Sequence, residues 1–475
     1  MAGVSEDADD GGGLRRALGP LHLITLGIGA IIGAGIFVLT GHAAAGYAGP
    51  GVVISFAIAG LGCLFAGLCY SEYAAMIPVA GSAYTYTYAT LGRFMAWIIG
   101  WNLVLEYLAA SSTVAVGWSG YFTNFLAGFG LHVPAALAAA PIAGSSLGAM
   151  SLTGAWFNLP AMAAVLLVSV FLITGVKMSA NFNNVMVAIK VTIVLAVILF
   201  GFAYIVPANH TPFIPPNTGE MGHFGWTGIF RATGVIFFSY IGFDAVSVAA
   251  QEAKNPQRDI PIGILGSLFI CTLLYMLMSY VLTGIAPYQT LNVAHPVSQA
   301  VEAHATTRWM APFVNIGAIV GLASVMLVFL LAQSRVFYAM SRDGLIPPAF
   351  REIHPRFATP WKGNIITGII CAIMAGVLPL DVLGELVSIG TLAAFCIVCA
   401  GVLVLRVRLP NQPRPFRTPL VWVTAPLGIV MCLFMMIFLP LDTWLRLAAW
   451  TAIGLCIYFL YSVRHSSPQH SSALQ

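Results

Sequence analysis

Long apolar runs separated by short polar segments fill the chain from residue 21 to residue 463. Most runs come close to the ~20 residues that an α-helix needs to cross the hydrocarbon core of a bilayer. The pattern predicts an all-α, polytopic membrane protein with twelve transmembrane helices. The predicted spans lie near residues 21–41, 50–72, 94–124, 159–176, 183–206, 228–252, 263–285, 311–341, 364–378, 384–405, 420–439 and 443–463.

The first apolar run is interrupted by Gly27, Gly29, Gly33 and Gly35. Glycine costs about 1 kcal/mol per helix position relative to alanine, so the run predicts a break near residues 33–35. Unwound backbone is tolerated in a membrane where it is buried in protein or lines a wet cavity, and its free N–H and C=O groups can bind a small charged molecule. The alternative is close helix packing, for which small residues at this spacing are also used.

The sixth run has a similar interruption, at Gly234 and at Ser239-Tyr240-Ile241-Gly242-Phe243-Asp244. Glycine-interrupted helices at matching positions of two halves indicate a secondary transporter site. Each half holds five helices, so the halves must have opposite topology, which predicts an inverted repeat followed by two helices. The predicted segments are a disordered cytoplasmic N-terminus (1–20), a first repeat (21–206), an external loop (207–227), a second repeat (228–405), a cytoplasmic link with the last two helices (406–463) and a cytoplasmic tail (464–475).

Charged residues are scarce and unevenly placed. They make up 8% of the chain, against about 25% in soluble domains, which supports a membrane location. With a cytoplasmic N-terminus, every Lys and Arg except Lys190, Arg231, Arg308 and Arg446 falls at or near the inner face. Because positive residues concentrate in cytoplasmic loops, we expect both termini to be cytoplasmic. The net charge of +4 does not indicate a nucleic-acid partner.

Three ionisable residues lie well inside predicted spans. Lys190 occupies the fifth span, where a central cation costs about 2.5–3.5 kcal/mol, and we interpret it as a proton carrier or a fixed replacement for a coupling cation. The alternative is a lysine whose amine snorkels to the headgroups. Glu106 and Asp244 are candidates for proton coupling, although either could instead cap a helix at a break. Glu72 and Glu252, near inner helix ends, are interpreted as interface charges.

Enzyme and metal signatures are lacking in the sequence. There is no Gly-x-x-x-x-Gly-Lys-Ser/Thr phosphate loop, and the ten histidines show no metal-ligand spacing. Cys396 and Cys399 form a C-x-x-C on an apolar helix without nearby histidines, so we interpret them as packing residues. The sequence therefore predicts no catalytic residue, no metal and no cofactor.

Four segments carry a resemblance to a known family: residues 27–41, Phe237-Phe238-Ser239-Tyr240-Ile241-Gly242-Phe243-Asp244, Ala253-Lys254-Asn255-Pro256-Gln257-Arg258-Asp259-Ile260-Pro261 and Ser341-Arg342-Asp343-Gly344-Leu345. Over residues 20–463 the chain resembles the amino acid–polyamine–organocation superfamily and, within it, bacterial relatives of the cationic amino acid transporters. The link that follows the sixth span is the most specific of these segments.

The resemblance implies a LeuT-type fold of five plus five helices that works by alternating access. It implies that backbone N–H groups at the first break hold an amino acid carboxylate, at Ile31, Gly33, Ala34 and Gly35. Carbonyls at the sixth break would hold the α-ammonium group, at Phe238 and Ile241. Half-helix dipoles favour the same assignment. Ala34 departs from the hydroxyl residue of many relatives, so one side-chain contact to the carboxylate is missing.

The resemblance also implies that Lys190 takes the place of a sodium ion, as in proton-coupled members. We expect a proton-coupled symporter for small neutral L-amino acids such as alanine, located in the bacterial cytoplasmic membrane and surrounded by lipid. Met326 in the eighth span is expected to limit the size of the substrate side chain. The alternatives are a transporter or exchanger of lysine and arginine, and an amino acid sensor without net flux.

Overall fold

The computed structural model describes residues 18–76, 82–144, 150–175, 180–248, 253–357 and 359–465. Ten of the predicted spans appear there as uninterrupted helices. These are α3 (Val52–Met76), α5 (Arg93–Ala127), α6 (Leu159–Ile173), α7 (Ala180–Gly201), α10 (Pro256–Ile285), α12 (Ala311–Arg342), α13 (Trp361–Val377), α14 (Leu380–Arg408), α15 (Val421–Ile437) and α16 (Leu441–Ile457).

The first and sixth spans are divided, close to where the glycine pattern predicts. The first break falls at residues 32–33, slightly before the predicted position, and the sixth falls at residues 241–244. The interruption predicted at Gly234 is wrong, because this residue lies within a regular helix. In the first, α1 (Pro20–Ile31) ends where Ile32 adopts an extended conformation (φ −72°, ψ 101°). The helix then resumes as η2 (Gly35–Leu39), α2 (Thr40–Ala43), η3 (Ala44–Ala48) and η4 (Gly49–Gly51). In the sixth, α8 (Gly225–Ile236) and η8 (Phe237–Tyr240) are separated from α9 (Ala245–Val248) by an extended Ile241 and by Gly242 at φ 112°.

The remaining elements are short and lie in the connections. One antiparallel pair of strands, with Ile142 opposite Leu152, is formed in the loop between α5 and α6. The short elements are α4 (Ser82–Leu91), η5 (Ala135–Leu137), β1 (Ile142–Ala143), β2 (Ser151–Leu152), η6 (Phe202–Tyr204), η7 (Pro207–His210), η10 (Tyr288–Leu291), α11 (Pro296–Glu302), η11 (Arg308–Met310), η12 (Pro348–Arg351), η13 (Tyr458–Ser462) and α17 (Val463–His465).

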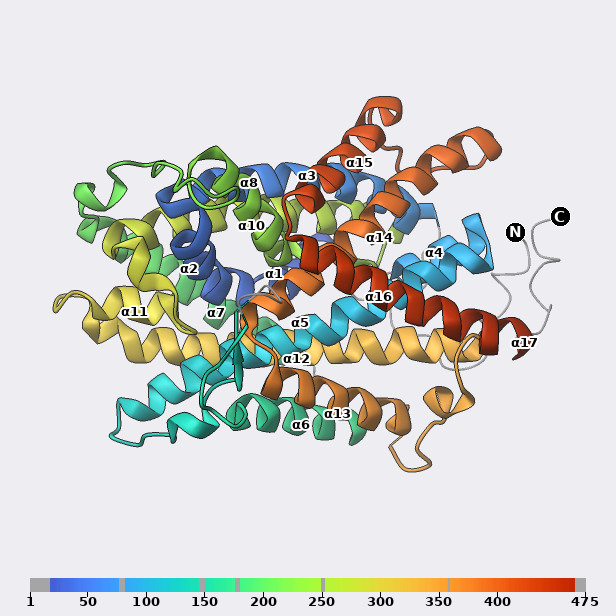
Figure 1. Ribbon diagram of the computed structural model, residues 1–475. Coiled ribbons are helices and arrows are strands. Elements are labelled where there is room, and N and C mark those ends of the chain that lie inside the picture. The colour runs from blue at the N-terminus through green and yellow to red at the C-terminus, as the bar shows by residue number, and fades with distance from the viewer. Residues whose placement is uncertain are drawn as a thin grey trace.

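The long helices form one bundle around the divided spans (Figure 1). α10 packs against both α1 and α3, α5 packs against α12 and α14, and α6 packs against α13. Leu167 on α6, Phe269 on α10 and Ile373 on α13 are more than half exposed. Large apolar side chains in such numbers on an outer surface mark contact with another apolar phase. Among the described residues, seven helical segments are long and apolar enough to cross a membrane, and four apolar helices are shorter. The all-α, polytopic fold is confirmed.

Contacts between sequence-distant elements define two ends of the bundle. At one end, which we call the basic end, the Lys254 amide donates to the Leu18 carbonyl over 2.8 Å, which joins the starts of α1 and α10. The ends of α3 and α14 meet there too, through Glu72 and Arg406. At the opposite end, the outer end, His42 of α2 meets Asp381 at the start of α14.

Candidate functional site

The two helix breaks lie against each other in the middle of the bundle. A Cβ atom added to Gly35 would lie 2.4 Å from the backbone of Ser239, and one added to Gly242 would lie 2.9 Å from the carbonyl oxygen of Ala30. Real Cβ atoms do not approach other atoms so closely, so glycine is required at both positions. Close helix packing and helix breakage, which the sequence left as alternatives, therefore occur together.

Lys190 of α7 points at the first break. Its side chain is fully buried, and its ammonium group donates to the carbonyls of Gly29 and Ile32, the latter over 3.0 Å. The hydroxyl oxygen of Ser324 in α12 lies 3.5 Å from Nζ. The ammonium thus faces three oxygens, two of them carbonyls that the end of α1 leaves without helical partners. The alternative of a lysine that snorkels to the headgroups is wrong, because the amine is directed into the protein.

Tyr275 of α10 joins the two breaks, and sequence reasoning missed it. Its hydroxyl oxygen lies 2.8 Å from the Ile31 carbonyl and 2.7 Å from the Ser239 carbonyl, so one hydrogen is shared between them. Tyr275 is fully buried. A buried phenol needs a partner for its hydroxyl group, which was the available signal, but the identity of that partner depends on the tertiary structure.

Of the predicted carboxylate ligands, Ile31 is the last residue of α1, whereas Gly33, Ala34 and Gly35 lie after α1, where η2 begins. Ile31, Gly33, Ala34 and Gly35 are all buried. The first amides of the outer half-helix have no partners within that helix, and its dipole makes this end partly positive. The arrangement is suited to an anion.

The predicted ammonium ligands lie at the second break. The Phe238 carbonyl ends a half-helix and accepts a bond from the Ile241 amide over 3.1 Å, which leaves its second lone pair for another donor. Ile241 is extended and buried, so its carbonyl points away from a regular helix. The partly negative end of this half-helix is suited to a cation.

Met326 lies on the helix that passes the first break. Ser324 approaches Lys190, and the side chain of Val325 would contact a Cβ atom at Gly33 at 3.2 Å. Met326 follows directly and is fully buried. Lys190 of α7 and Ser324 and Val325 of α12 therefore lie at the first break, and Met326 is the next residue of α12.

The two predicted carboxylates lie at the end of the second break, where α9 begins. Asp244 accepts a hydrogen bond from the hydroxyl group of Tyr107 over 2.8 Å. Glu106, which precedes Tyr107 on α5, is also buried. It is close enough to Asp244 for the two carboxyl groups to interact electrostatically, and it contacts Thr391 of α14. Its Oε2 atom has no hydrogen-bond partner among the residues that the structure describes. The structure thus brings Glu106 and Asp244 together as a buried acidic pair.

A polar cluster that the sequence did not predict closes the outer end of the first span. His42 lies 2.9 Å from Asn292 through Nδ1 and 3.0 Å from Asp381 through Nε2. The ring of Tyr47 contacts His42 edge-on and lies under the Arg231 guanidinium at 4.7 Å. These contacts connect the first span to α8, to α14 and to the loop before α11.

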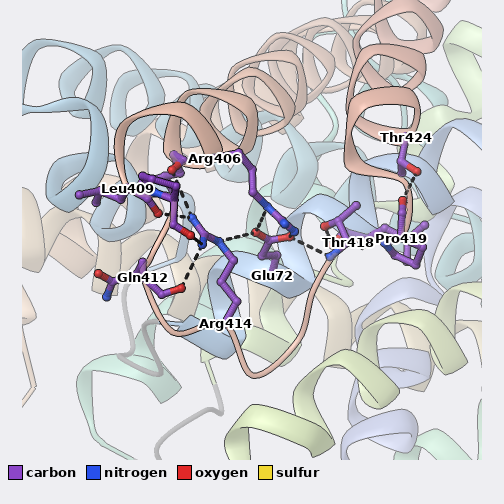
Figure 2. Close-up of polar contacts among 11 residues, drawn as sticks. Glu72, Arg406, Leu409, Gln412, Arg414, Thr418, Pro419 and Thr424 are labelled. Atoms are coloured by element: carbon purple, nitrogen blue, oxygen red, sulfur yellow. Dashed lines mark hydrogen bonds and ion pairs between the residues drawn. The ribbon is translucent and has the colours of Figure 1, made fainter.

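A second polar cluster lies at the basic end (Figure 2). Glu72 is 1% exposed and accepts from Arg406 over 2.8 Å and from the Thr418 amide over 2.8 Å, with Arg414 Nε at 3.2 Å. Arg414 also donates to the Leu405 carbonyl in the last turn of α14 and to the Leu409 carbonyl directly after this helix. Burial lowers the pKa of Arg414, and Glu72 opposes this shift. The interpretation of Glu72 as an interface charge is wrong, because its carboxylate is buried and paired; Glu252 lies outside the described residues.

Two divided helices whose free backbone groups face each other inside a helical bundle are typical of one class of proteins, the multi-pass membrane transport proteins. The family model described as amino acid permease matches residues 18–461, and the chain belongs to this family. The resemblance to the amino acid–polyamine–organocation superfamily is thereby confirmed. Relatives are named as permeases or transporters, and no catalytic family is indicated.

Individual relatives cover nearly the whole chain. It is 48% identical to the branched-chain amino acid permease BcaP of Bacillus subtilis (strain 168), over 95% of this chain and 94% of that protein. It is 47% identical to the methylthioribose transporter of the same organism, over 95% of each. The vacuolar cationic amino acid transporter 4 of Arabidopsis thaliana is 38% identical, over 84% of this chain and 64% of that protein.

Proposed function

We propose that this protein is a secondary active transporter that carries small neutral L-amino acids together with protons. The observation that carries the proposal is the position of Lys190, whose ammonium group binds carbonyls of the first break. The same break would hold the substrate carboxylate on its amides. Protonation of Lys190 and binding of the substrate would therefore act on one short piece of backbone.

The proposed coupling follows from the donor inventory of lysine. An ammonium group has three N–H donors and a positive charge, whereas the neutral amine loses one donor and the charge. Release of the proton would weaken the bonds to Gly29 and Ile32 and free the end of α1 to move. Lysine is suited to this role because burial makes its protonation state adjustable. Glu106 and Asp244 would form a second proton site beside the sixth span.

The proposed transport cycle uses an inverted repeat of five plus five helices. The cluster of His42 with Asp381 would restrict the outer side of the site, and the cluster around Glu72 would fix α3 and α14 at the opposite side. The basic end would face the cytoplasm, because Lys and Arg concentrate on the inner side of membrane proteins. Both termini would then be cytoplasmic, in the inner membrane of a bacterium.

A second candidate function is transport of cationic amino acids. It is favoured by the buried pair Glu106 and Asp244, which could neutralise a lysine or arginine side chain, and by relatives named as cationic amino acid transporters. The relatives named for branched-chain amino acids and for methylthioribose favour an uncharged substrate. A sensor without net flux would share the same binding site.

Counterflow into proteoliposomes tests the proposal and separates these candidates. Vesicles loaded with one unlabelled amino acid are diluted into labelled alanine, leucine, lysine or arginine, with and without a pH gradient. We expect alanine counterflow and alanine accumulation that grows with an inward proton gradient. Accumulation of lysine and arginine alone would support the second candidate, and binding without counterflow would support a sensor.

Amino acid amides are expected to fail as competitors of alanine uptake. The amide of alanine keeps the α-amino group but lacks the anion that the amides at Gly33–Gly35 would bind. The measurement is inhibition of labelled alanine uptake by alanine and by alaninamide at equal concentrations. Inhibition of similar strength by both would contradict the proposed anchoring of the carboxylate.

Replacement of Met326 by serine is expected to shift uptake from alanine towards larger or basic substrates. A thioether fills space without fixing a shape, and one methylene is worth only about 1–3 kcal/mol of discrimination, so the shift should be graded. Competition by alanine, leucine, lysine and arginine measures the ranking. Met340→Ser is the matched control, because Met340 is equally buried on the same helix and packs against Gly100. An identical ranking in Met326→Ser and the native protein would contradict this role.

A further inference from the structure

A groove of about 760 Å³ lies at the basic end, between α10 and the loop that joins α14 to α15. Its walls come from two segments that are more than 140 residues apart in the sequence, so only the tertiary structure forms it. The lining includes Arg258, Ile262, Leu265 and Phe269 of α10, and Pro415 and Phe416 of the loop. This groove is separate from the helix breaks, and the inference does not rest on the proposed transport function.

The α10 wall of the groove is a single apolar stripe with a cation at one end. Ile262, Leu265 and Phe269 follow Arg258 at helical spacing, and Phe269 is 72% exposed. The distance along the helix from residue 258 to residue 269 is about 16 Å at 1.5 Å per residue. Half of a ~30 Å hydrocarbon core is similar in length. The stripe therefore runs from the headgroup level to about the middle of the bilayer.

The cation at the polar end of the groove has no protein partner within the described part of the chain. Arg258 is exposed and makes no ion pair there, and neither does the exposed Arg417 beside Phe416. The neighbouring Arg406 and Arg414 differ, because both bind Glu72 (Figure 2). Pro261 adds a polar feature, because it has no amide hydrogen and leaves the Gln257 carbonyl without its helical partner. That carbonyl can accept a hydrogen bond from a hydroxyl group.

We propose that this groove is a binding site for one anionic phospholipid of the leaflet at the basic end. The phosphate group binds Arg258, with Arg417 close by, and one acyl chain covers Ile262, Leu265 and Phe269. Arginine pairs well with phosphate because its planar fork of donors matches the phosphate oxygens. A headgroup with free hydroxyls, as in phosphatidylglycerol, also has a donor for the Gln257 carbonyl.

Native mass spectrometry of the purified full-length protein tests the proposal. Phosphatidylglycerol or phosphatidylcholine with the same acyl chains is added in detergent, and bound lipids are counted. We expect one phosphatidylglycerol molecule in excess of phosphatidylcholine on the native protein. Arg258→Gln should weaken its retention about fivefold, the effect of one arginine near an anionic surface. Arg351→Gln is the control, because Arg351 is also exposed and unpaired among the described residues at the basic end.

The acyl contacts are tested separately with Ile262→Ser, a change at an exposed position that should leave thermal unfolding of the protein unaltered and lower retention of both lipids. Equal losses in Arg258→Gln and Arg351→Gln would overturn the proposal in favour of a diffuse attraction to positive charge. Equal retention of the two lipids by the native protein would overturn the headgroup assignment. Retention of phosphatidylglycerol that neither Arg258→Gln nor Ile262→Ser changes would place the lipid elsewhere.

Discussion

Lys190→Ala is expected to abolish amino acid uptake driven by a pH gradient and to leave measurable substrate binding. The variant loses the only ammonium group that contacts the first break in the described structure, and with it the proposed proton site. The Gly29 and Ile32 carbonyls lose a buried donor, which costs about 1–3 kcal/mol for an unsatisfied group, so a lower unfolding temperature is also expected. Uptake is measured in proteoliposomes with the inside alkaline.

A second variant separates coupling from structure. Lys190→Gln keeps N–H donors for the carbonyls but has no proton to release. We expect it to restore stability and exchange of substrate without restoring accumulation on a pH gradient. Lys254→Ala is the control, because Lys254 is exposed and lies just before the start of α10. Accumulation at the native rate in Lys190→Ala would show that this lysine does not couple transport to protons.

Gly35→Val is expected to abolish substrate binding. A Cβ atom at this position would lie 2.4 Å from Ser239, where both backbone and side chain are in the way, so the two breaks must separate. Overpacking of this kind costs about 1–3 kcal/mol in a core and would displace the amides proposed to hold the carboxylate. Binding is measured as the increase in unfolding temperature that a saturating amino acid produces.

The matched control for this change is Gly46→Val, in η3 of the same span. No atom lies within 4 Å of a Cβ atom placed at Gly46, so the substitution has the same effect on helix propensity without the clash. We expect the Gly46→Val protein to bind substrate. A Gly35→Val protein that folds and binds like this control would contradict the assignment of the carboxylate site to the first break.

The broken helices show how far sequence reasoning reaches at the site. Gly33 and Gly35 predicted the first break, and Gly242 with its neighbours predicted the second, because glycine is disfavoured in helices whatever surrounds it. The contact of Gly35 with Ser239 was not predictable in this way. This contact forms only when two segments about 200 residues apart in the sequence pack together. In the sequence, such a close approach is indicated only by a small residue in one of the two segments.

The ionisable residues show the same division. Lys190, Glu106 and Asp244 could be identified from the sequence, because burying a charge inside an apolar run costs free energy whichever residues surround it. The prediction for Glu72 was wrong because its position close to a helix end suggested contact with solvent. In the structure, Arg406 of α14 and Arg414 of the following loop pair with its carboxylate and cover it. His42 was passed over because one histidine carries no signal until Asp381 and Asn292 are known to surround it.

The properties that depend on local chemistry could be predicted from the sequence: an all-α membrane protein, the positions of its apolar spans, the two helix breaks and the rare buried charges. The length of an apolar run, a glycine and a buried charge each change the free energy of the segment that contains them. Their effects can therefore be predicted from the sequence without knowing the neighbouring helices. The partners of these residues are known only from the packing of the helices: Lys190 binds the end of α1, Tyr275 lies between the breaks, and Arg258 lies beside the loop at Phe416. Partners depend on how distant helices pack, and many packings satisfy the same hydrophobic pattern.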